Sequence, residues 1–98
     1  MDLQQKLAKT LRELRKLRSD EMGSLITQQD MADDAGIDVK YYGEIERGTR
    51  KPSNKTRKRL DLGDDVSCTP TLGIVAKFAE TLGMSLSDFC KQIEQQRD

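Results

Sequence analysis

A run of positive charge occupies residues 47–59 of the chain. It holds seven basic residues and no acidic one: Arg47, Arg50, Lys51, Lys55, Arg57, Lys58 and Arg59. Lysine and arginine at this density attract a phosphate backbone, so nucleic-acid binding is the chemistry that the run favours. A charge run is equally typical of a solvated loop, and the sequence alone leaves both interpretations open.

The residue types that carry catalysis or hold metal ions are scarce. The sequence has no histidine, which is the commonest general base and metal ligand. Its two cysteines, Cys68 and Cys90, lack metal-ligand spacing and fit a reducing compartment, with a redox switch as the less favoured alternative. No glycine-rich phosphate loop is visible. The sequence therefore predicts no enzyme, no cofactor and no metal site.

Length and composition favour one small water-facing domain. The 98 residues predict a single domain over residues 1–98. The net charge is zero, but the acidic residues lie outside the basic run, so a local positive field survives. No apolar stretch is long enough for a membrane span and no secretory signal is present, so we expect a cytoplasmic location.

Helices are the elements expected to position these charges. Leucines spaced by three or four residues from Leu3 to Leu17 predict a first helix. Residues 19–26 lose that spacing and predict a loop. Thr27 is typical of an N-cap, and the short helix that follows it is expected to end at Gly36, where glycine tolerates the left-handed conformation.

A second short helix follows the glycine turn. Asp38 is a candidate N-cap, Tyr42 and Ile45 face inward together, and Gly48 is placed to end the helix. Two short helices joined through a glycine turn indicate a helix-turn-helix over residues 27–48. Its second helix would fit the major groove of B-DNA, which is about 12 Å wide.

The remainder predicts a long loop and two further helices. Residues 49–69 have no helical period, and we interpret residues 53–69 as an inserted loop. Pro70 suits a first helical turn, and Ser85 suits the cap of a last helix, so residues 70–96 are expected to hold the C-terminal helices. The prediction is an all-α domain of five helices, with long loops after the first helix and after the helix-turn-helix.

The segments TQQDMADDAG and YYGEIERG resemble the Cro/CI-type (Xre-like) helix-turn-helix family of bacterial and phage regulators. LRELRKLR is similar to the first helix of that family, and PTLGIVAKFAETLGMSLSDF to its last two helices, so the resemblance covers most of residues 3–90. It implies a lambda-repressor-like fold. It also implies a sequence-specific regulator of transcription, expected to be a repressor, that binds double-stranded DNA in the bacterial nucleoid.

The resemblance further implies which side chains contact DNA. Val39, Lys40 and Glu44 match exposed positions that face the bases, and Tyr41 and Arg47 match positions near the phosphates. The predicted DNA-contacting residues are Gln28, Asp38, Val39, Lys40, Tyr41, Glu44, Arg47, Arg50, Lys51, Lys55 and Arg57.

Two further pairings are expected. Arg15 and Glu46 match a paired arginine and glutamate in the resembled family, which implies a structural ion pair. In the last helix we expect Phe89 to face the core and Ile93 to face a second copy, which gives a homodimer that reads two half-sites.

A protein-interaction module is the alternative function. In that interpretation the helix-turn-helix is a scaffold, and the inserted loops bind a protein partner, as in an antitoxin or a polymerase-binding adaptor. The zero net charge and the long loops favour the module, whereas the recognition segment and the adjacent basic run favour DNA.

Overall fold

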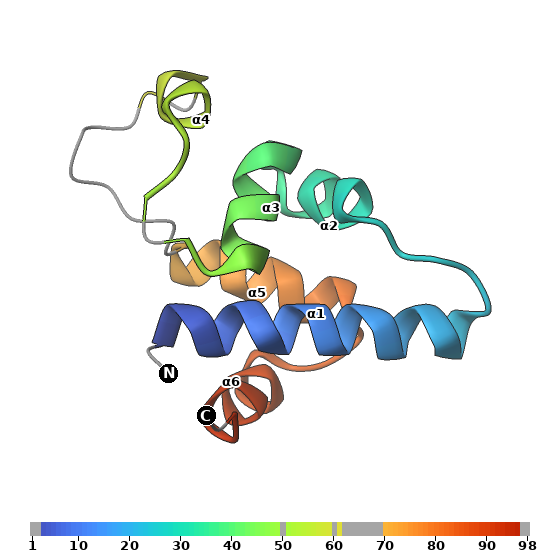
Figure 1. Cartoon of the computed structure of the whole chain (residues 1–98). Helices are drawn as coiled ribbons and strands as arrows, with labels where there is room; N and C mark the ends of the chain where they lie inside the picture. The colour runs from blue at the N-terminus through green and yellow to red at the C-terminus, as the bar shows by residue number, and fades with distance from the viewer. Residues whose placement is uncertain (1–2, 50, 60, 62–69, 97–98) are drawn as a thin grey trace.

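The computed structural model describes residues 3–49, 51–59, 61 and 70–96, over which the chain forms helices and no strand. The helices are α1 (Leu3–Met22), α2 (Gln28–Ala35), α3 (Val39–Arg47), α4 (Asn54–Arg59), α5 (Leu72–Thr81) and α6 (Leu86–Glu94). In Figure 1, α1 runs through the bundle with α6 on one side and α2, α3 and α5 on the other. Helix α4 stands apart from this bundle. The all-α prediction is confirmed.

One hydrophobic core joins every helix except α4. The rings of Tyr42 on α3 and Phe78 on α5 meet edge to face, with their centroids 5.3 Å apart. The leucine stripe of α1 extends beyond this core, because Leu3 and Leu17 are 67% and 56% exposed. The buried apolar residues are Leu7, Ala8, Leu11, Ile26, Met31, Ala32, Tyr41, Tyr42, Ile45, Phe78, Ala79, Leu82, Phe89 and Ile93.

The helix-turn-helix forms as its caps predict. Thr27 and Asp30 make a reciprocal capping box at the start of α2. Gly36 ends α2 in the left-handed conformation, with φ of 71°, and the carboxylate of Asp38 accepts a hydrogen bond from the Lys40 amide at the start of α3. Gly48 ends α3 with φ of 74°. The predicted pair of helices within residues 27–48 is confirmed.

The first predicted loop is too long. Helix α1 continues to Met22, so residues 19–22 are helical and the connection to α2 is shorter than residues 19–26. The apolar spacing ends early because the last turn of α1 projects beyond the core, where Asp20, Glu21 and Met22 are exposed. A helix turn with nothing to pack against needs no apolar stripe.

The second predicted loop is also wrong in part, because α4 lies inside it and raises the number of described helices from five to six. Ser53 supplies the local cause. Its hydroxyl accepts a hydrogen bond from the Thr56 amide, and its carbonyl accepts one from the Arg57 amide, which begins a helix. Residue 60 and residues 62–69, including Cys68, lie outside the described part of the chain.

The C-terminal helices need two corrections. Helix α5 begins at Leu72 with Thr71 as its N-cap, so Pro70 precedes the helix rather than occupying its first turn. Ile93 is only 7% exposed and belongs to the core of the monomer, so the expectation that it faces a partner is wrong. Ser85 caps α6 and Phe89 is fully buried, as predicted.

Candidate nucleic-acid interface

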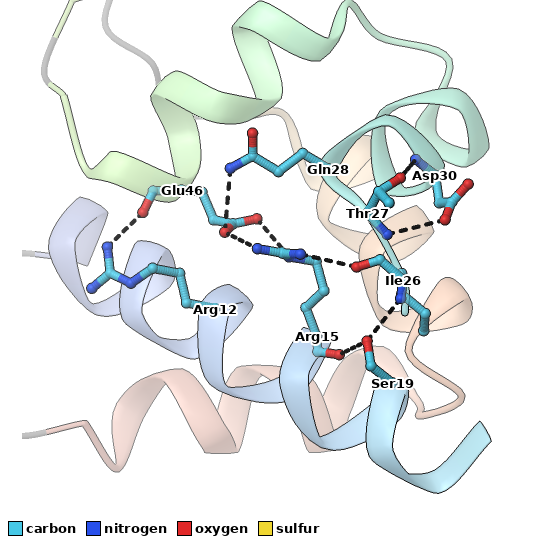
Figure 2. Close-up of polar contacts among 8 residues, drawn as sticks. All are labelled: Arg12, Arg15, Ser19, Ile26, Thr27, Gln28, Asp30 and Glu46. Carbon is cyan, nitrogen blue, oxygen red and sulfur yellow. Dashed lines mark hydrogen bonds and ion pairs between the residues drawn. The ribbon is translucent and has the colours of Figure 1, made fainter. Parts of the chain in front are cut away.

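A buried ion pair ties α3 to α1. The guanidinium of Arg15 donates through Nε and Nη2 to the two carboxylate oxygens of Glu46, at 3.1 and 2.9 Å (Figure 2). The Glu46 side chain is 3% exposed and the Arg15 side chain 22% exposed. Two parallel hydrogen bonds between planar groups also fix their relative orientation. The expected Arg15–Glu46 ion pair is confirmed.

The same arginine reaches the connection between α1 and α2. Its Nη1 donates to the carbonyl of Ile26 at 2.9 Å, while the Ser19 hydroxyl accepts from the Ile26 amide at 2.8 Å (Figure 2). Arg12 adds a bond of 2.7 Å from its Nη1 to the Glu46 carbonyl. Helices α2 and α3 are therefore held on α1 by polar contacts as well as by the core.

These contacts change the ionisation of the groups involved. Burial opposes the charge on Arg15, but Glu46 outweighs it, so the pKa of Arg15 is raised. Burial also raises the pKa of Tyr42, and the nearby Glu46 carboxylate adds to the effect. Both shifts favour a charged guanidinium and a neutral phenol beside Glu46.

An open hollow lies on the outer side of α2 and α3. It is lined by Gln28, Val39, Lys40, Gly43, Glu44, Arg47 and Ser53. Gly43 lies between two other lining residues, because a methyl group placed on it would lie 3.4 Å from Nη1 of Arg47 and 3.5 Å from Oε1 of Gln28. Lys40 and Arg47 are exposed, whereas Gln28 and Val39 are half-buried. The first turns of both helices thus meet on one accessible face.

Two of the predicted DNA-contacting residues of α3 are buried. Glu44 is 4% exposed, and its carboxylate accepts a hydrogen bond from the Ser53 amide at 2.7 Å. Tyr41 is 7% exposed and packs in the core. The expectation that Glu44 is exposed is therefore wrong, and Tyr41 is buried as well. The hydrogen bond from the Ser53 amide offsets only part of the negative charge that Glu44 brings to the hollow.

The Asp38 carboxylate makes two contacts at the start of α3. One carboxylate oxygen accepts from the Lys40 amide at 2.7 Å, and the other lies 2.7 Å from Nε of Arg59 on α4. The Asp38 side chain is 6% exposed. Asp38 therefore joins α4 to α3, a role that the sequence did not reveal because the two residues lie far apart in the chain.

The residues of the basic run differ in their exposure and in their contacts. Lys51 and Lys55 are exposed, Arg57 is half-buried and contacts Asn54, and Arg50 lies outside the described residues. Lys55 on α4 lies close enough to Lys40 on α3 to lower the pKa of Lys40. Sequence reasoning missed this meeting of α4 with α3, although Ser53 after Pro52 is a helix-start signal that could have indicated α4.

Metal sites and membrane-spanning helices are absent from the described part of the chain. It contains no group of three or more histidine, cysteine or acidic side chains placed to hold a metal ion. Within the same residues no helix has the length and apolar character needed to cross a membrane.

The comparisons with known proteins agree with this geometry. The family described as "Helix-turn-helix" matches residues 9–61, a range that includes most of α1 and the whole of α2, α3 and α4. No curated protein and no solved structure matches the chain significantly. The match spans more than half of the sequence and coincides with the helices that form the hollow. The chain belongs to the Cro/CI-type helix-turn-helix family of DNA-binding regulators.

Proposed function

We propose that the protein is a sequence-specific transcriptional regulator, acting as a repressor, that places α3 in the major groove of double-stranded DNA. The observation that carries this proposal is the accessible face shared by the first turns of α2 and α3, with Lys40 and Arg47 exposed on it. Their positive charge suits the phosphate-rich rim of a groove.

Several residues on this face and next to it in the chain have distinct parts in the proposal. Val39, at the first turn of α3, would contact a thymine methyl group. Gln28 opens α2, where backbone amides and the side-chain amide can donate to a phosphate. Arg47 closes α3 and would contact the backbone. Lys51, exposed after α3, and Arg57 on α4 would extend the backbone contacts.

The test is a fluorescence anisotropy titration. The labelled duplex carries the DNA that flanks the reading frame of the protein, and an unrelated duplex of equal length is the control, at a stated salt concentration. We expect the flanking duplex to bind more tightly by about a thousandfold or more. Equal affinity for the two duplexes would contradict sequence-specific regulation.

A homodimer is part of the proposal, because dimers of this motif read two half-sites about one DNA turn apart. Because Ile93 is buried, the exposed leucines of the groove that it lines are the surface proposed for dimerisation. That groove is lined by Leu3, Gln4, Leu7, Pro70, Leu72, Val75, Cys90, Ile93 and Glu94. Leu72 and Leu3 are 69% and 67% exposed at its edges. Two such apolar edges from facing copies would bury each other.

Sedimentation of the whole protein tests the dimer. We expect a dimer at tens of micromolar, a shift towards monomer in Leu72→Arg, and little change in Leu25→Arg. Leu25 is a matched control because it is 74% exposed but does not line the groove. A monomeric wild type, with and without DNA, would reject the dimer.

A protein-interaction role is the second candidate function. A separate hollow on the α2 side is lined by Met22, Ile26, Asp30, Asp33, Asp34 and Thr81, next to the exposed Leu25 in the chain. This apolar and acidic surface favours a partner with basic and apolar side chains. A chain that binds this kind of partner but no duplex DNA would make the helix-turn-helix a scaffold.

A further inference from the structure

Helix α4 is held against α3 at both of its ends. At its beginning, the Ser53 amide donates to the Glu44 carboxylate at 2.7 Å. At its end, Nε of Arg59 lies 2.7 Å from the Asp38 carboxylate. The chain therefore turns back after Gly48 and runs beside α3 towards the start of that helix, where α4 stands (Figure 1).

This placement gathers three cations at the start of α3. Lys55 and Arg59 are one helix turn apart and share a face of α4. Lys40 occupies the first turn of α3 and is exposed. The side-chain contact with Lys55, together with the repulsion between the two ammonium groups, is the main reason that the pKa of Lys40 is lowered, and desolvation and Arg59 add smaller effects.

The positive charge of this cluster is only partly balanced. Asp38 opposes the repulsion on Lys40, but it already accepts from the Lys40 amide and pairs with Arg59. The amino terminus of α3 adds its own partial positive charge to the same place. Holding like charges together is unfavourable, and an anion bound between them would relieve the repulsion.

We propose that Lys40, Lys55 and Arg59 together bind one phosphate of the DNA backbone, so that α4 acts as a clamp beside the recognition helix. The proposal rests on the proposed DNA-binding function and deepens it. A phosphodiester presents two non-bridging oxygens, which can accept from two ammonium groups and a guanidinium at once. Lys40 then positions α3 on the duplex and does not read a base, in contrast to the role implied by the family resemblance.

Helix α4 provides a matched control. Lys58 is exposed and carries the same charge on the same helix, but among the described contacts neither Asp38 nor Lys40 pairs with it. A general attraction of α4 for DNA would involve Lys58 as much as Lys55. A clamp on one phosphate would involve Lys55 alone of these two.

The experiment measures whether the effect of a protein substitution on DNA affinity depends on the charge of one particular phosphate. A series of duplexes of the flanking DNA carries an uncharged methylphosphonate linkage at one position each. Wild type, Lys55→Gln, Lys40→Gln and Lys58→Gln are titrated against every duplex and over a range of salt concentrations. We expect Lys55→Gln to flatten the dependence of log affinity on log salt by about 0.9 with unmodified DNA.

One linkage should distinguish the clamp residues from the control. At that position the methylphosphonate should remove the affinity difference between wild type and both Lys55→Gln and Lys40→Gln. The difference between wild type and Lys58→Gln should persist there.

The opposite results overturn the proposal. Lys40 and Lys55 share no phosphate if the affinity losses from protein substitution and from methylphosphonate are additive at every position. The same conclusion follows if the affinity loss in Lys40→Gln depends on a base substitution instead. In both cases the duplex still binds and the proposed function survives. If wild type binds no duplex, the proposed function fails and the clamp fails with it.

Discussion

The helix-turn-helix and the α4 segment follow one another in the chain, yet they are held in place by different forces. Helices α2 and α3 bury Met31, Tyr42 and Ile45 completely and are braced by the Arg15–Glu46 pair. Helix α4 adds a single buried side chain, Thr56, and is attached through Glu44 and Asp38. Burial of apolar side chains is the main force that holds the first region, whereas polar contacts hold the second.

The largest expected effect comes from breaking the Arg15–Glu46 ion pair. Arg15→Met leaves the buried Glu46 carboxylate without its main partner, and we expect a loss of about 2–4 kcal/mol in the free energy of unfolding. Urea denaturation measures this loss. Lys16→Met, at an exposed neighbouring position, should change stability by less than about 0.5 kcal/mol. Adding Glu46→Met to Arg15→Met should recover part of the loss, and a larger loss in the double variant would show that the orphaned charge is not the cause.

The contrast between these regions also explains what the sequence could predict. The caps at Thr27 and Asp38, the glycines that end α2 and α3, and the inward Tyr42 and Ile45 are local or periodic signals, and the structure confirms them. The Arg15–Glu46 pair was predicted from the family resemblance. Periodicity could not give these contacts, because 31 residues separate the partners.

The wrong predictions fall where local pattern carries little information. The last turn of α1 and the whole of α4 are helical but lack an apolar stripe, so they resemble loops in the sequence. Glu44 was placed outward because it lies in the recognition helix. The Glu44 carboxylate accepts from the Ser53 amide, because the chain returns along α3 after that helix ends. The spacing of residues in the sequence does not indicate this return.

The next effect separates the two roles considered for Glu44. Because its carboxylate accepts from Ser53 and is buried, Glu44→Ala should lower stability by about 1–3 kcal/mol and weaken DNA binding through α4. The preference among DNA sequences should not change. Selection of binding sites from a randomised duplex pool measures that preference. A changed preference at a cytosine would restore Glu44 as a base-reading residue.

A smaller effect is expected at the start of α3. Asp38→Ala removes both the cap and the contact with Arg59, and it should cost about 1 kcal/mol of stability. Asp38→Asn keeps a good capping side chain and removes the charge, so it should be close to wild type in thermal unfolding. If both variants were equally destabilised, the Arg59 contact would matter more than the cap.

The smallest expected effect is a gain. Gly43 lies inside α3, and a methyl group there would make ordinary contacts with the side chains of Arg47 and Gln28. Gly43→Ala should therefore stabilise the protein by about 0.5–1 kcal/mol, because alanine loses less backbone entropy in a helix. Thermal unfolding measures the gain. A loss of stability would mean that the Gln28 and Arg47 side chains cannot move aside.

The central claim is that DNA binds on the α2–α3 face with α4 beside it. Amide chemical shifts, followed by nuclear magnetic resonance while the flanking duplex is added, locate the contact surface directly. If DNA binds on this face, the largest changes are expected at Gln28, Val39, Lys40, Gly43 and Arg47, followed by α4. Changes confined to the groove between α1, α5 and α6, with the amides of α2 and α3 unmoved, would contradict it.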